Sequence, residues 1–125
     1  MMTSLISVAL GGALGASARF LTNVVFLRLF GAGFPWGTAF VNVLGSFLMG
    51  ILVVALADKD GSKFAPFLLT GFLGGFTTFS AFSLDTMKLV ERGEIAFASV
   101  YVVGSVAISI LGLAMGMALA KGALS

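Results

Sequence analysis

The sequence predicts an all-α membrane protein in which a single domain, residues 1–125, holds four transmembrane helices. Of the 125 residues, 59% are hydrophobic and 10% are charged, and the mean hydropathy is +1.15. An ordinary soluble domain has about 45–50% apolar and about 25% charged residues. A helix needs roughly 20 apolar residues to cross a bilayer, so this length accommodates four spans and short loops. We therefore expect no soluble domain and no enzyme module.

The predicted spans are separated by segments that stop a helix or attract water. No Lys or Arg precedes the first apolar run, 5–30, so we expect a retained span instead of a cleaved signal. Glycines and Pro35 end it. The second span, 36–57, begins with Trp36, which suits the membrane interface, and polar residues follow it. The third and fourth spans are 64–88 and 95–120.

The third span contains an irregular segment. Residues 71–83 read G-F-L-G-G-F-T-T-F-S-A-F-S, and we expect the helix to break near Gly74-Gly75. Inside hydrocarbon every backbone N–H and C=O needs a protein partner, so such a segment is stable only where protein buries it or a water-filled path adjoins it. The segment therefore indicates the passage of an ion or solute.

Missing residue types narrow the chemistry. The chain has no Cys and no His, which excludes disulfides, thiolate metal sites and imidazole proton transfer. The net charge is +2, but the basic residues are scattered, so we expect no nucleic-acid partner. The first acidic residue is Asp58, and the later acids are expected in loops or towards span ends. Without a carboxylate in mid-membrane, passive anion movement is favoured over proton coupling or cation conduction.

The basic residues are balanced across the membrane. Once Arg19, inside a span, is left out, each side carries three, so the positive-inside rule selects no orientation. Insertion in both directions would give an antiparallel homodimer with its two-fold axis in the membrane plane; alternatively, another signal sets one orientation. The residues are Lys59, Lys63 and Lys121 on one side, and Arg28, Lys88 and Arg92 on the other.

Hydroxyl or amide residues recur every four positions on the second and fourth spans, which places each set on one helix face. The two stripes are candidate walls of a path. Alternatively, hydroxyls bond their own helix or join helices. Asn42 is the strongest candidate because a helix does not readily satisfy both donors of a primary amide. The sets are Thr38, Asn42 and Ser46, and Tyr101, Ser105 and Ser109.

Arg19 lies inside the first span, where a guanidinium is costly. With Thr22 and Asn23 on the same helix face, it is expected to face an aqueous vestibule; alternatively, it snorkels to the interface. Phe79 and Phe82 are three residues apart and share a face. Such a pair is usually core, but the positive edge of a phenyl ring can also stabilise an anion without a formal charge.

Three motifs resemble those of the Fluc (CrcB) fluoride channels. Residues 11–19 read G-G-x-x-G-A-x-x-R, residues 37–45 read G-T-x-x-V-N-x-x-G, and residues 74–83 read G-G-F-T-T-F-S-A-F-S. In this order they cover nearly the whole chain, and together they are highly specific. Ala81 departs from the pattern, in which we expect Thr.

The resemblance implies a channel that exports fluoride passively across a bacterial inner membrane. It implies a dual-topology homodimer with two pores and a sodium ion at the interface, bound by the backbone carbonyls of Gly74 and Thr77. Phe79 and Phe82 would be pore phenylalanines, and Asn42 an amide donor. Arg19 would lie in the vestibule. Lesser pore contacts would be Thr38, Ser80, Ser83, Tyr101 and Ser105.

Two alternative functions stay open. A small dual-topology multidrug-type transporter needs a mid-membrane carboxylate, which we do not expect here. A non-transporting membrane subunit would use its glycines and phenylalanines for packing alone, and it predicts no flux in liposomes.

Overall fold

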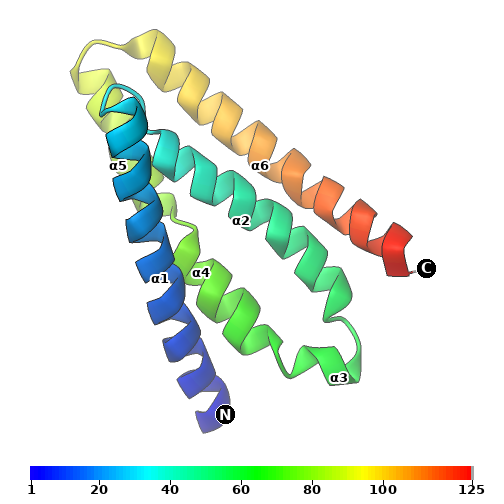
Figure 1. Cartoon of the computed structure of the whole chain (residues 1–125). Coiled ribbons are helices and arrows are strands. Elements are labelled where there is room, and N and C mark those ends of the chain that lie inside the picture. Colours follow the sequence, from blue (N-terminus) through cyan, green and yellow to red (C-terminus); the bar gives the residue numbers. More distant parts are fainter. Residues whose placement is uncertain (125) are drawn as a thin grey trace.

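The computed structural model describes residues 1–124, and every regular element in that range is a helix (Figure 1). Within it, four segments are long and apolar enough to cross a membrane, the third being a series of consecutive helices. In chain order the elements are α1 (Met2–Phe30), α2 (Trp36–Ala55), α3 (Lys59–Ser62), the π-helix η1 (Pro66–Leu73), α4 (Gly74–Phe76), α5 (Phe79–Glu91) and α6 (Ile95–Leu124).

The helices begin and end within a few residues of the predicted spans. Gly31 ends α1, and Gly93 lies in the turn between α5 and α6. Their φ angles are 76° and 77°, a left-handed conformation that is costly for a residue with a Cβ. The third segment reaches Glu91 and α6 reaches Leu124, beyond the predicted ends at 88 and 120. A helix can continue past the bilayer edge because its charged side chains reach water there.

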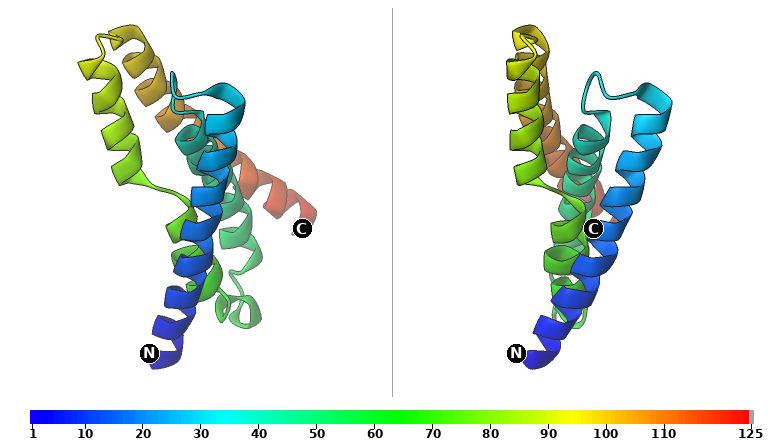
Figure 2. Two further views of the ribbon diagram at one scale, coloured as in Figure 1. Left: turned by 60° about the vertical axis from the view of Figure 1, so that its left-hand side comes forward. Right: turned by 90° about the vertical axis from the view of Figure 1, so that its left-hand side faces the viewer.

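Two crossings make most of the contacts. α1 crosses η1 and α4, and α2 runs beside α6 (Figures 1 and 2). Gly11 lies against the carbonyl oxygen of Phe67, and Gly15 lies against that of Phe72. A Cβ at either glycine would collide with η1. The absent side chains therefore allow the close helix approach that is common in membranes.

α5 packs on the first half of α6, as Figure 2 shows. Phe82 and Leu89 from α5 form a buried cluster with Ala98 and Tyr101 from α6. Elsewhere many large apolar side chains are exposed on the outside of the single chain. Such a surface suits contact with lipid or with another apolar protein surface.

The third segment is interrupted at Thr77 and Thr78. Both have extended backbones, with φ −86°, ψ 159° and φ −154°, ψ 125°. The predicted break near Gly74-Gly75 is not confirmed, because Gly74 has helical angles of −61° and −38° and both glycines belong to α4. Gly75 serves close packing instead, since a Cβ there would lie 2.6 Å from the carbonyl oxygen of Gly12.

Candidate functional site

The break is held by two reciprocal hydrogen bonds from α2. Asn42 Nδ2 donates to the carbonyl oxygen of Thr78 at 2.9 Å, and Asn42 Oδ1 accepts from the Thr78 N–H at 2.7 Å. Thr78 is also the N-cap of α5, since its Oγ1 accepts from the N–H of Ala81 at 3.1 Å. Side chains therefore satisfy backbone groups that have left the helix ladder, as a bilayer requires.

Arg19 bonds the other side of the break. Its Nε donates to the carbonyl oxygen of Gly75 at 3.1 Å. The C-terminal end of a helix carries partial negative charge, so a guanidinium stabilises it. Arg19 does not line the groove that contains Asn42. Within one chain, it is therefore a partner of the interrupted helix.

A groove of about 420 Å³ lies between α2, the break and α6, and we name it the central groove. Asn42 and Ser46 line it from α2, and Ser105 and Ser109 line it from α6. Two of the three residues in each stripe found in the sequence therefore lie on either side of one groove. Among the described residues, none of those that line this groove is charged.

Three serine hydroxyls in the lining of the groove are free of protein partners, whereas those of Thr77 and Thr78 are bonded within the third segment. Within residues 1–124, the side chains of Ser46, Ser105 and Ser109 make no hydrogen bond. By contrast, Ser17 and Thr22 donate to carbonyls of their own helix at 2.7 and 2.8 Å. The alternative that stripe hydroxyls bond their own helix therefore does not apply to these three serines, which remain available to a ligand.

Phe79 and Phe82 line the same groove in different environments. Phe82 is only 8% exposed, whereas Phe79 is 77% exposed. Their ring centroids are 5.5 Å apart, and the Phe82 ring lies 5.1 Å from that of Tyr101. Phe82 is thus held between two aromatic neighbours, while most of Phe79 is left uncovered by its own chain.

The structure does not place Ser80 and Ser83 in the central groove. Both are exposed. Ser83 Oγ donates to the carbonyl oxygen of Phe79 at 3.0 Å, within its own helix, and Ser80 Oγ lies 3.5 Å from Thr78 Oγ1. Any contact between these two residues and an ion in the groove would need a different surface.

A second cavity, of about 380 Å³, lies where the α1–α2 loop meets α5, and we name it the end cavity. Thr38 lines it. The stripe on α2 therefore has its first residue in the end cavity and its next two in the central groove. Charged side chains also line the end cavity, namely those of Asp85, Lys88 and Arg92.

Sequence reasoning missed the contact between Asp85 and Tyr101. The hydroxyl of Tyr101, which is 1% exposed, donates to Asp85 Oδ2 at 3.2 Å. Because α5 continues to Glu91, Asp85 lies in the second turn of α5 and in the last third of the segment Pro66–Glu91, so the expectation that the acids lie in loops or towards span ends is not contradicted. Its spacing of three from Phe82 places both residues on one face of α5, but no pattern within α5 shows that this face meets α6.

The described residues contain no group of three or more His, Cys, Asp and Glu side chains that could hold a metal ion. A cation would therefore need other oxygen ligands. The carbonyls of Gly74 and Thr77 receive no side-chain hydrogen bond within residues 1–124, and Gly74 is exposed. Backbone oxygens next to an interrupted helix are known ligands of Na⁺ in membrane proteins, so these residues fit that role chemically.

Comparisons with known proteins agree over nearly the entire chain. Residues 6–117 match the family model described as CrcB-like protein, Camphor Resistance (CrcB). A protein of Cereibacter sphaeroides named fluoride-specific ion channel FluC is 64% identical over 122 residues, covering 98% of each chain. Proteins with the same name from Paracoccus denitrificans and Agrobacterium fabrum are 53% and 45% identical, with coverage of 98% and 96% of this chain and 98% of each relative.

Proposed function

Because this chain belongs to the CrcB family, we propose that it is a fluoride-selective channel through which fluoride leaves the cell passively. Its relatives are ion channels and not enzymes, and its four apolar helices make it a multi-pass membrane protein. The structural observation that carries the proposal is the central groove, in which an amide, free hydroxyls and two phenylalanines meet without any charged side chain. The proposed location is a bacterial inner membrane.

The groove suits a small anion. Fluoride is strongly hydrated, so a dry path must replace its water with short hydrogen bonds, and bonds to an ion are roughly twice as strong as neutral ones. Asn42 uses one amide N–H on Thr78, and a primary amide has a second. The free hydroxyls of Ser105 and Ser109 add further donors. Neutral donors in series also release the ion, as conduction requires.

The two phenylalanines contribute to the anion path through their ring edges. A phenyl edge carries the positive part of the ring quadrupole, so Phe79 and Phe82 attract an anion without the desolvation cost of a charged residue. Arg19 donates from Nε to the carbonyl oxygen of Gly75. Its two other guanidinium nitrogens contribute positive potential to a vestibule at the mouth of the path. Ser105 adds a secondary contact in the central groove, and Thr38 adds one in the end cavity. Tyr101 would act beside the Phe82 ring, and Ser80 and Ser83 would contribute only at a surface shared with a second copy.

We extend the proposal to an antiparallel homodimer with two pores. The balanced basic residues support insertion in both directions. The exposure of Phe79, at 77%, supports a second copy that covers this residue. At the interface, the carbonyls of Gly74 and Thr77 would hold a structural Na⁺, near the negative end of α4. Arg19 occupies the Gly75 carbonyl and leaves those of its neighbours available.

Fluoride efflux from liposomes tests the function. Vesicles loaded with KF and containing the purified chain should release fluoride to an external electrode only after valinomycin lets K⁺ follow, because passive anion flow is electrogenic. Vesicles loaded with KCl should release little chloride under the same conditions. Fluoride release no faster than from protein-free vesicles, or chloride release at an equal rate, would reject the proposal.

A further inference from the structure

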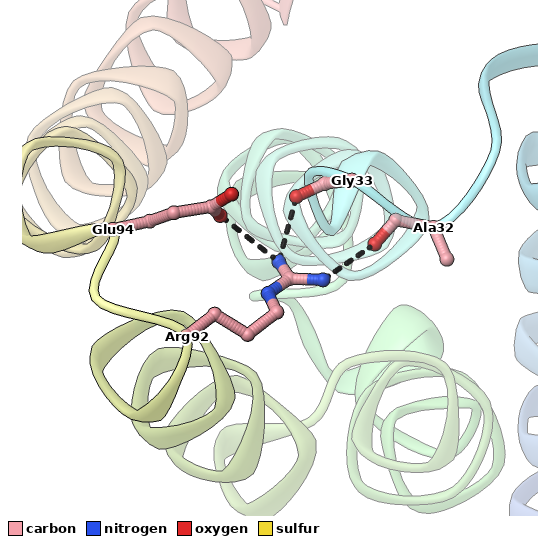
Figure 3. A network of polar contacts seen from close by, with 4 residues as sticks. All are labelled: Ala32, Gly33, Arg92 and Glu94. Carbon is pink, nitrogen blue, oxygen red and sulfur yellow. Dashed lines mark hydrogen bonds and ion pairs between the residues drawn. The ribbon is translucent and has the colours of Figure 1, made fainter.

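Arg92 joins the two loops at one end of the molecule (Figure 3). One guanidinium nitrogen, Nη2, donates to the carbonyl oxygen of Gly33 at 2.8 Å, and Nη1 donates to that of Ala32 at 3.3 Å. Nη2 also lies 3.2 Å from Glu94 Oε2. We name this set the Arg92 clamp. It joins Arg92, the C-cap of α5, to the loop between α1 and α2. Arg92 is 60 residues from Ala32 and 59 from Gly33 in the chain.

Among the hydrogen bonds of residues 1–124, the clamp is one of two polar contacts that hold α5 and its N-cap to the first half of the chain. At the start of α5, Asn42 bonds Thr78; at its end, Arg92 bonds the loop. Between them α5 packs mainly on α6 and only lightly on α2. The end cavity occupies the space that results, with Thr38 on one wall and Asp85 on the other. The clamp therefore sets the distance between α5 and α2 at that cavity.

The bonds to the loop carbonyls carry the clamp, and the ion pair adds little. Arg92 and Glu94 are 44% and 39% exposed, and ion pairs at such exposure contribute little because water screens them. Glu94 Oε2 makes no aligned hydrogen bond within the described residues. The fork of a guanidinium, in contrast, can hold two carbonyls at once, which an ammonium on a flexible stem does not do.

We propose that Arg92 is a positioning residue, which keeps the end cavity narrow by holding α5 to the loop of residues 31–35. It acts through α5, which carries Phe82 and Asp85, and does not itself bind the ion. Its effect on flux rests on the proposed function, but its effect on the cavity does not. Loss of the clamp lets α5 move outward and exposes Thr38, which is 6% exposed in the intact chain.

Cysteine labelling tests the cavity directly, because the chain contains no Cys. Thr38→Cys would be placed in the otherwise unchanged chain and combined with Arg92→Ala, Arg92→Lys or Glu94→Gln, and its reaction with a water-soluble thiol reagent would be timed in liposomes. Loss of two hydrogen bonds from a charged donor should speed labelling about tenfold or more in Arg92→Ala. The labelling rate with Arg92→Lys should fall between the rates with Arg92 and with Arg92→Ala. The rate with Glu94→Gln should stay close to that of the chain with an unchanged clamp. Equal labelling rates with and without Arg92 would overturn the proposal.

A second cysteine separates the clamp from general loosening of the fold. Ala120 is 7% exposed and belongs to the last turns of α6 (Ile95–Leu124). Figure 1 shows that the C-terminal end of α6 lies at the opposite end of this helix from the α5–α6 turn, where the clamp is. Arg92→Ala should leave the labelling of Ala120→Cys unchanged; parallel acceleration at both sites would overturn the proposal in favour of a purely structural role. With Thr38 intact, fluoride efflux per chain should fall in Arg92→Ala. If Arg92→Ala accelerates labelling at Thr38→Cys but neither the unchanged chain nor any variant conducts fluoride, the positioning role of Arg92 stands and only the proposed function is rejected.

Discussion

Asn42 bonds both backbone groups of Thr78, donating to its carbonyl oxygen at 2.9 Å and accepting from its N–H at 2.7 Å. One side chain on α2 thus replaces the helix bonds that the third segment gives up at its break. The same amide lines the central groove. The residue that stabilises the irregular backbone therefore also borders the proposed ion path.

Replacement of Asn42 should impair both properties. Asn42→Ala leaves the Thr78 N–H and C=O without these partners, and each unpaired buried group costs about 1–3 kcal/mol. We expect a lower unfolding temperature in detergent and loss of most fluoride efflux. Ser46→Ala is the matched control, since Ser46 lines the same groove one turn further along α2 and makes no hydrogen bond within residues 1–124. Equal unfolding temperatures for the two variants would contradict the assigned role of Asn42.

The two phenylalanines should differ in their effect on stability. Phe82→Ile removes aromatic contacts with both Phe79 and Tyr101, each worth about 0.5–1.5 kcal/mol, whereas Phe79→Ile removes only one of these contacts. We therefore expect a larger fall in unfolding temperature for Phe82→Ile, and slower fluoride efflux for both because isoleucine has no ring edge. Unchanged efflux in both variants would reject an aromatic contribution to conduction.

The four spans could be predicted because hydropathy is a local property, and each span needs only enough apolar residues to cross the bilayer. The position of the break could not. Gly74-Gly75 suggested an interruption because glycine weakens helices, but Gly75 is needed where α4 meets Gly12 on α1. Thr78 makes the break because Asn42, 36 residues away in the chain, supplies its hydrogen bonds. That partner is visible only once α2 and α5 are packed.

The candidate site was predictable to a similar extent. Spacing alone placed Asn42 with Ser46, and Ser105 with Ser109, on two helix faces, and the structure adds that both faces line one groove. The contact between Asp85 and Tyr101 depends on how α5 packs on α6, which spacing within either helix does not determine. For the same reason, the exposure of Ser80 and Ser83 could not be read from their alternation with phenylalanines.

Gly74 and Gly75 offer a test of the proposed sodium site. A Cβ at Gly74 would be 3.7 Å from its nearest neighbour, the carbonyl oxygen of Leu69, so Gly74→Ala fits within one chain. A Cβ at Gly75 would lie 2.6 Å from the Gly12 carbonyl oxygen, so Gly75→Ala should destabilise the chain itself. A bound ion raises the unfolding temperature as its concentration rises. We expect Na⁺, compared with N-methylglucamine, to stabilise the unchanged protein.

The sodium response should be lost selectively in Gly74→Ala, because its methyl group would stand at the exposed carbonyl surface where the ion would bind. Gly75→Ala should show a lower unfolding temperature at every sodium concentration but retain some response. An unfolding temperature of the unchanged protein that is independent of Na⁺ would reject the site. If Na⁺ raises the unfolding temperature of Gly74→Ala as much as that of the unchanged protein, the ion binds at a different site.

Asp85 separates a passive channel from a proton-coupled transporter. It lies inside the third span and accepts a hydrogen bond from Tyr101, so it is the carboxylate that such a transporter would use. Asp85→Asn keeps an oxygen for Tyr101 but cannot release or take up a proton. A weaker hydrogen bond costs about 1 kcal/mol, so the fluoride rate of a channel should stay within about tenfold of the unchanged protein, and it should still require valinomycin. Tyr101→Phe, which removes the other half of the pair, should slow efflux to a similar degree. If Asp85→Asn folds normally but abolishes fluoride movement while Tyr101→Phe does not, proton coupling through Asp85 becomes the better explanation.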